Sequence, residues 1–243
     1  MNIYEIFPVD ILVGAAYDVV TWMSGLLEPL AGAESAAIAI VLLTIVVRIL
    51  LIPVGWSQAK AGAARERLAP QLAELQRRYR KSPELLQRKT MELYAREKAS
   101  PFAGCLPVLA QTPVLMAVYG LFVLPSVGGA HNELLAHAVA SVPLDATLVA
   151  QIVASDVTGA SAAVFAAIIV PVALVAQGSR RLLTSSGAGD AGGSGLARAL
   201  SFLPFMTAVV TVFVPFAAGI YLLTTTAWTF AERLIMRRVL RAA

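Results

Sequence analysis

The sequence has little charge and almost no cysteine. Only 14% of its 243 residues are charged, whereas 58% are hydrophobic, and the mean hydropathy is +0.75. Because soluble domains carry about 25% charged residues, an ordinary soluble domain is excluded and an integral membrane protein is predicted. The single cysteine, Cys105, cannot form an intramolecular disulfide, so the redox compartment cannot be inferred from it.

Motifs of common catalytic sites are also missing. The sequence contains no GxxxxGK[ST], no HExxH and no GxSxG. The apolar stretches hold no histidine and no carboxylate suited to acid or base work, because Glu232 lies at the inner end of the last stretch, so general acid or base catalysis is not expected. We therefore expect no enzyme activity, no cofactor and no metal site. His131 and His137 are expected to face solvent.

Lys and Arg are absent from two long segments, residues 1–35 and 125–160. Eleven of the nineteen basic residues lie between Lys60 and Lys98, and most others follow later apolar stretches. Since cytoplasmic flanks of membrane helices are enriched in Lys and Arg, the N-terminus is predicted outside and the C-terminus in the cytoplasm. The first ten residues contain no basic residue, so a cleaved signal peptide is not expected.

A bilayer core of roughly 30 Å requires about 20 apolar residues per helix, and the pattern predicts an all-α membrane protein with five transmembrane helices. The predicted spans are residues 34–56, 101–125, 160–178, 196–214 and 215–232. The predicted remaining segments are an outer interfacial amphipathic helix (1–33), a cytoplasmic helical hairpin (57–100), an extracytoplasmic loop (126–159), a cytoplasmic Gly/Ser linker (179–195) and a basic cytoplasmic tail (233–243).

Residues 1–33 have two interpretations. Polar and small residues recur at helical spacing opposite an apolar stripe that includes Trp22, Leu26 and Leu30, which is typical of a helix in the membrane interface. The alternative is a sixth span with Asp18 buried, which would place the N-terminus in the cytoplasm.

The segment 57–100 carries the strongest positive charge of the chain. Leucine and tyrosine stripes predict two helices, and Ser82 followed by Pro83 predicts where the second helix begins. The positive charge fits a solvated surface, anionic lipid head groups or ribosomal RNA.

Arg48 lies near the middle of the first predicted span. About eight residues, some 12 Å of helix, separate it from the cytoplasmic end, more than the side chain covers by snorkelling. No carboxylate lies at a similar depth, and a charge at mid-bilayer costs about 2.5–3.5 kcal/mol on insertion scales. We therefore infer a hydrated cavity within the membrane. Candidate lining residues are Thr44, Gln111, Gln177, Thr224, Thr225, Thr226 and Trp228. A membrane threonine also commonly bonds its own helix, and tryptophan also marks interfaces.

Residues 67–122 resemble the hairpin and second span of the YidC family of membrane protein insertases, within the Oxa superfamily. The matching signature residues are Pro101, Gly104, Cys105, Leu106, Pro107, Gln111 and Pro113, with Pro204, Pro215 and Gly219 near the C-terminus. Arg48 falls where the family has its groove arginine. The usual aromatic and asparagine residues of the last span are replaced by Leu, Thr and Ala types. Without the large external domain of other members, the sequence is most similar to short Gram-positive, actinobacterial-type members.

The resemblance implies a bacterial plasma membrane protein whose spans surround a hydrophilic groove, open to the cytoplasm and to lipid. It implies nascent membrane proteins as partners, together with the ribosome or the general secretion translocon, and neither DNA nor a small-molecule substrate. Two other classes remain: a small anion transporter or channel, because a wet cavity with a cation could bind an anion, and a passive assembly scaffold. An odd number of spans without an inverted repeat disfavours the transporter.

Overall fold

The structure, a computed structural model, describes residues 7, 9–97, 112, 116–117, 119–185 and 202–242. Helices form most of this part of the chain. The helices are α1 (Val9–Ala31), η2 (Gly32–Glu34), α2 (Ser35–Leu50), α3 (Ile52–Arg78), α4 (Pro83–Arg96), η3 (Glu133–Ala136), α6 (Leu148–Val153), α7 (Gly159–Ser185), α9 (Leu203–Phe213) and α10 (Phe216–Ala242). The strands are β1 (Ser126–Val127), β2 (Ala130–His131), β3 (Ala138–Val139) and β4 (Val142–Pro143).

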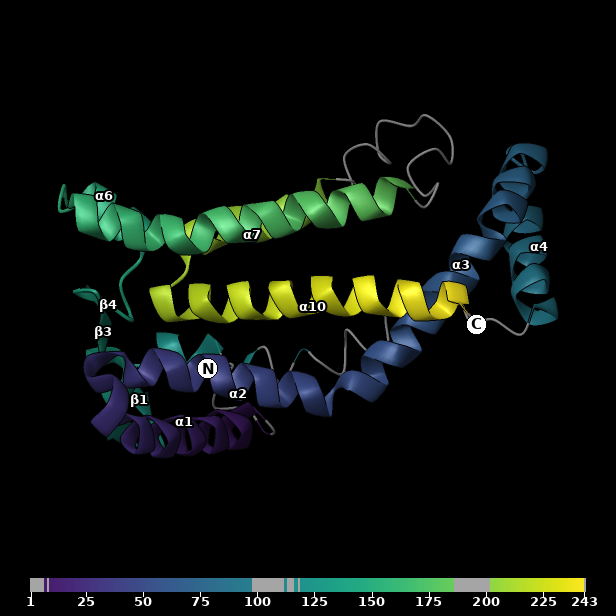
Figure 1. The fold of residues 1–243 in the computed structure, drawn as a ribbon. Coiled ribbons are helices and arrows are strands. Elements are labelled where there is room, and N and C mark those ends of the chain that lie inside the picture. The colour runs from purple at the N-terminus through teal and green to yellow at the C-terminus, as the bar shows by residue number, and fades with distance from the viewer. Residues whose placement is uncertain are drawn as a thin grey trace.

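Helix α10 is the central element of the fold. It packs against α2 and α3 on one side and against α7 and α9 on the other. The short strands and α6 lie at one end of the molecule, and the α3–α4 pair lies at the opposite end, near the C-terminus (Figure 1). The two ends therefore differ in charge, because the strands and α6 contain no Lys or Arg and α3 and α4 contain many.

Within the described residues, two apolar helical stretches are long enough to cross a membrane. One is Val9–Leu50, which comprises α1, η2 and α2, and the other is Gly159–Leu182 within α7; Pro204–Phe213 of α9 is apolar but shorter. Most of the predicted span 101–125 lies outside the described residues. The five-span arrangement and its segment limits therefore stay a prediction.

Helix α1 folds back on α2, and the turn between them has Gly32 at φ +51°. Val13 and Val20 are buried on its packed face, and Ser24 Oγ lies 3.0 Å from Ser35 Oγ of α2. The apolar stripe that the sequence predicts, which includes Trp22, is not the face that packs against the protein. Trp22 is 66% exposed. Helix α1 thus has one apolar face against the protein and a second facing outward.

The chain changes direction at Leu51, between α2 and α3. Leu51 has φ −89° and ψ 0°, and Pro53 occupies the first turn of α3. Proline is compatible with a first helical turn because it needs no backbone N–H donor there. Helix α3 then continues without a break to Arg78, so the expected limit between residues 56 and 57 is not a helix boundary. The second helix of the hairpin begins at Pro83, as the sequence predicts, although the Ser82 side chain makes no capping bond.

Two antiparallel β-hairpins, not expected from the sequence, follow the second predicted span. Strand β1 pairs with β2 and β3 with β4. The first turn is Gly128–Gly129, both at positive φ, which suits a two-residue hairpin. Asn132 anchors this region: fully buried, it donates from Nδ2 to the carbonyls of Leu121 (2.6 Å) and Leu124 (2.9 Å) and accepts from the Leu134 N–H.

The start of α10 is fixed by the loop before α6. The N–H groups of Phe216 and Ala217 donate to the carbonyls of Ala146 (2.8 Å) and Leu144 (3.0 Å), which satisfies donors that a helix N-terminus leaves free. Pro215 lies between α9 and α10, and the preceding Val214 is extended, as expected before proline.

Candidate functional site

Arg48 lies on α2 and reaches across to α10. Its Nε and Nη2 donate to Thr225 Oγ1 at 3.2 and 3.0 Å, and the side chain is half-buried. One hydroxyl oxygen therefore receives two donors from a permanently charged group. A guanidinium has five N–H donors, so the remaining donors are available for another acceptor.

The surroundings of Arg48 are polar: it forms no ion pair within the described part of the chain, although the Glu232 carboxylate lies near enough to attract it. The four ion pairs of the described chain all lie within α3 and α4 or just after them, and none involves Arg48. Trp228 and Glu232 follow Thr225 on α10 at helical spacing, so these side chains share a face. We call Arg48, Thr225, Trp228 and Glu232 the Arg48 cluster.

Two buried polar atoms of the Arg48 cluster have no hydrogen-bond partner within the described part of the chain. They are Trp228 Nε1, a donor, and Glu232 Oε1, an acceptor; these two side chains attract each other without reaching hydrogen-bond geometry. Buried polar groups in proteins are normally hydrogen-bonded, and each unsatisfied group costs about 1–3 kcal/mol. These atoms, together with the unused donors of Arg48, make this face of α10 suited to binding a polar segment of another molecule.

Gly55 allows α3 to approach α10 closely beside this cluster. A methyl group built on Gly55 would overlap the Glu232 carboxylate. The absence of a side chain at residue 55 therefore makes room for Glu232. The sequence analysis missed Gly55, because a glycine in an apolar stretch carries no signal of what packs against it.

The other predicted groove residues have different surroundings. Thr44 is 4% exposed and donates to the Ile40 carbonyl of its own helix, and Thr224 similarly donates to Ile220. Thr226 donates to Leu222 and Leu223 and lies on the opposite side of α10, facing α7 and α9. Gln177 is half-buried on α7. The assignment of all these residues to a substrate groove stays a prediction.

Most of the predicted signature residues cannot be compared with the structure. Pro101, Gly104, Cys105, Leu106, Pro107, Gln111 and Pro113 lie outside the described residues. Pro204 occupies the first turn of α9, and a methyl group at Gly219 would meet Thr211 and Ile168 at ordinary van der Waals distance. Pro204 and Pro215 thus lie at helix ends, where proline is tolerated.

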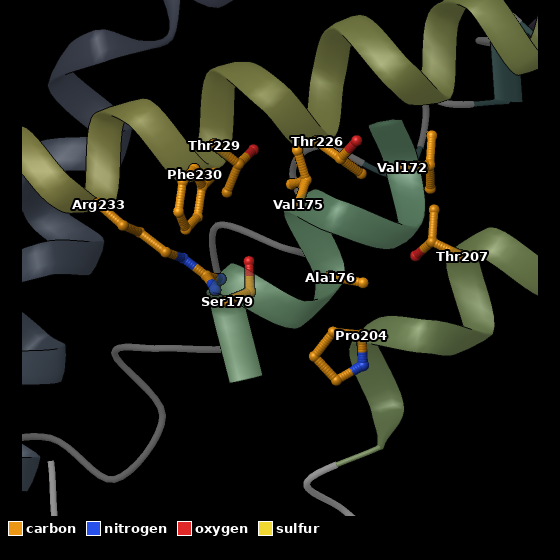
Figure 2. A pocket seen from close by; sticks show the side chains of 10 residues that line it. All are labelled: Val172, Val175, Ala176, Ser179, Pro204, Thr207, Thr226, Thr229, Phe230 and Arg233. Atoms are coloured by element: carbon orange, nitrogen blue, oxygen red, sulfur yellow. The ribbon is translucent and has the colours of Figure 1, made fainter. Parts of the chain in front are cut away.

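A cavity of about 370 Å³ lies between α7, α9 and α10 (Figure 2), and no residue of the Arg48 cluster lines it. Its walls combine apolar side chains, such as Val172 and Phe230, with hydroxyl groups and one cation, Arg233. We call it the α7–α9–α10 cavity. The sequence analysis assigned Arg233 only to the basic tail, because helix periodicity does not reveal which neighbouring helix a side chain faces.

The predicted cytoplasmic hairpin presents charged side chains to the surface. Arg67 of α3 lies 3.5 Å from Glu97, just after α4, and this ion pair links the two arms. On α4, a hydrogen bond from Lys89 lowers the pKa of Glu92 below its ordinary value, and the charges of Lys89 and Arg88 act in the same direction. The hairpin surface is therefore held together by exposed ion pairs, which contribute little stability each.

Comparisons with known proteins agree with the resemblance found in the sequence. A family model described as "60Kd inner membrane protein" matches residues 27–243. The chain is 39% identical over 85 residues to a protein named membrane protein insertase YidC from Clostridium perfringens, and 43% identical over 81 residues to one of the same name from Helicobacter pylori. The aligned part is 35% of this chain in the first case and 33% in the second.

The aligned part also covers only a fraction of these relatives. It is 36% of the Clostridium perfringens protein, 41% of an equally named protein from Fusobacterium nucleatum at 38% identity, and 15% of the Helicobacter pylori protein. These relatives carry the name of an insertase, which does not favour an anion transporter.

Proposed function

The chain belongs to the 60Kd inner membrane protein family, a family of membrane proteins, and from this premise we propose that it is a membrane protein insertase. Its partners are nascent membrane proteins. The proposed site is a groove beside the Arg48 cluster, open to the cytoplasm and to lipid, with the other predicted groove residues at its edges. The groove receives an apolar segment of the client together with a short polar tail, and then releases the segment sideways into the bilayer.

The observation that carries this proposal is the environment and the hydrogen bonding of the Arg48 side chain. It is half-buried in an apolar helix, it contacts a hydroxyl rather than a carboxylate, and it keeps spare donors. An acidic or polar client tail that meets these donors loses less solvation than it would in lipid, where an unpaired polar group costs several kcal/mol. Arg48 acts by lowering that barrier, and it does not need to release a proton or form a bond.

The energy for insertion comes from the client and the membrane. Burial of about 20 apolar residues in the bilayer core is favourable, and the membrane potential moves an acidic tail outward with about 2.3 kcal/mol per charge per 100 mV. No nucleotide is therefore needed, in line with the missing phosphate-binding motif. The client is released because lipid solvates its apolar segment better than a polar groove does.

The proposed topology has five spans, with the N-terminus outside and the C-terminus in the cytoplasm of a bacterial cell. The exposed basic surface of α3 and α4, at one end of the molecule (Figure 1), supports a role for the hairpin in recruiting the ribosome, the translocon or anionic lipid. Deletion of residues 60–98 should reduce insertion of ribosome-bound clients. Unchanged insertion after this deletion would show that the hairpin has no recruiting role.

Substitution of Arg48 tests the groove mechanism. In proteoliposomes, Arg48→Ala should impair insertion of clients with acidic translocated tails, whereas Arg48→Lys should largely retain it because the charge is kept. A client with a neutral tail provides the internal control and should respond less to Arg48→Ala. Equal insertion of the acidic-tail client by the parent and both variants would refute the role of the charge.

A further inference from the structure

The α7–α9–α10 cavity has the chemistry of an anion site with an apolar wall. Figure 2 shows Arg233 extending from α10 toward Ser179 of α7, across the cavity. Within the described part of the chain, Arg233 has no ion-pair partner, and none of the residues that line the cavity carries a carboxylate. A guanidinium that has unused donors and lies in a cavity without carboxylates is suited to binding a phosphate or carboxylate group.

The hydroxyl groups of the cavity divide into two kinds. Thr226 and Thr229 donate their protons to carbonyls of α10 itself, so they offer only acceptor lone pairs. The hydroxyls of Ser179 and Thr207 make no hydrogen bond to other described residues and are able to donate. Arg233 and Ser179 therefore supply donors from two helices at one end of the cavity, and Thr207 lies at the other end, beside Val172 (Figure 2).

The rest of the wall is apolar and firmly packed. Ala176 of α7 lies near Pro204 of α9, Val172 lies near Thr207, and Val175 points toward α10 (Figure 2). The Phe230 ring packs on the backbone of α7 at Gly178, where a methyl group would lie only 2.7 Å from the ring. The cavity thus has a charged end, formed by Arg233, and an apolar wall that can contact a hydrocarbon chain.

The cavity also lies at the basic end of the helices. It involves the C-terminal part of α7, the first turns of α9 and the second half of α10, the end of the molecule that carries the α3–α4 pair (Figure 1). Next to it, the Arg180 guanidinium stacks 4.2 Å from the centre of the Phe202 ring and connects α7 to the start of α9. In the proposed topology this end faces the cytoplasm, where anionic lipid head groups attract basic side chains.

We propose that the α7–α9–α10 cavity binds an anionic phospholipid, with the phosphate held by Arg233 and Ser179 and the start of an acyl chain against Val172, Val175 and Phe230. A volume of about 370 Å³ accommodates a head group rather than a whole lipid. An anionic head group binds better than a zwitterionic one, because the lining offers no carboxylate to a choline or ethanolamine cation. The site shares no residue with the Arg48 cluster and does not depend on the proposed groove.

Lipid photocrosslinking in nanodiscs tests this proposal with the full-length protein. Phosphatidylglycerol and phosphatidylcholine probes, each with a diazirine on the acyl chain, are activated, and the labelled peptides are identified by mass spectrometry. The variants are Arg233→Gln and, as a second disruption, Ser179→Leu, which removes a donor and fills the cavity mouth. Arg238→Gln on the same helix is the matched control, because Arg238 is exposed like Arg233 but does not line the cavity.

Phosphatidylglycerol should label peptides of α7 and α10 in the parent and in Arg238→Gln. We expect Arg233→Gln to reduce this labelling about five-fold, since a basic residue near an anionic lipid contributes about 1 kcal/mol, and Ser179→Leu should also reduce it. Equal labelling of parent and Arg233→Gln, or equal labelling by the two lipids, would overturn the proposal. The proposal would also be overturned if a crosslinker at residue 175 reacted with a ribosome-bound nascent chain and not with lipid. If Arg233→Gln does not fold, undiminished labelling of Ser179→Leu overturns it as well.

Discussion

Removal of the Thr225 hydroxyl isolates the contact that holds Arg48. Thr225→Val keeps the shape of the side chain and deletes the only oxygen to which Arg48 donates, at 3.0 and 3.2 Å, among the described residues. Hydrogen bonds to charged groups contribute about 1.5–3 kcal/mol. Because Arg48 is only half-buried, solvent screens the contact, and we expect the free energy of unfolding to fall by about 1 kcal/mol.

Thr224→Val is the matched control for this experiment. The Thr224 hydroxyl donates to Ile220 of its own helix and does not contact Arg48. Its removal should change the free energy of unfolding by less than about 0.5 kcal/mol, because a threonine that bonds its own helix adds little stability. Both variants are unfolded in mixed micelles of increasing SDS fraction, and unfolding is followed by circular dichroism.

A double-mutant cycle decides whether the loss comes from the Arg48 contact. In an Arg48→Ala background, Thr225→Val should have almost no effect, which gives a coupling energy of about 1 kcal/mol between the two residues. Equal losses for Thr225→Val and Thr224→Val, or a loss that persists without Arg48, would refute the inference that Thr225 holds the guanidinium.

Two further predictions concern regions outside the Arg48 cluster. Asn132→Asp should lower the free energy of unfolding by about 2–4 kcal/mol, because a carboxylate cannot donate to the Leu121 and Leu124 carbonyls; SDS unfolding that matches the parent would contradict the anchoring role. The lowered pKa of Glu92 predicts that its ion pair stabilises α4 above the ordinary carboxylate pKa, and that this stabilisation disappears as the pH falls through the lowered pKa. In an NMR titration, Lys89→Gln should raise the Glu92 pKa toward its ordinary value, and an unchanged pKa would exclude Lys89 as the main cause.

Helix identity and family were predictable from the sequence because they depend on local signals. Hydrophobic runs predicted a helical membrane protein, and Pro83 marked the start of α4 since proline is favoured in a first helical turn. The signature around residues 101–113 and the position of Arg48 indicated the family, and the family model agrees over residues 27–243.

Packing partners were not predictable, because lipid tails and protein cores are equally apolar. The periodicity of α1 did not reveal that Val20 faces the protein while Trp22 faces outward. For the same reason, the three consecutive threonines of α10 looked alike in the sequence. Only the structure separates Thr225, which contacts Arg48, from Thr226, which lines the α7–α9–α10 cavity.

The β-hairpins and the Leu51 break were missed for a different reason. Strands of two residues are too short to produce an alternating pattern, and only the Gly128–Gly129 pair indicated a turn. The break at Leu51 lies just before Pro53, in the first turn of α3, but the apolar run continues through it and hides the change of direction.

The most direct test of the account is whether water from the cytoplasm reaches position 48. Arg48→Cys and Ile49→Cys, each in a Cys105→Ser background, are exposed in inverted membrane vesicles to a charged thiol reagent that does not cross membranes. Ile49 is the control, because it is 50% exposed on the outer surface of an apolar helix. The account predicts rapid labelling at position 48 and little at position 49. No labelling at position 48, or equal labelling at both, would contradict a hydrated groove around Arg48.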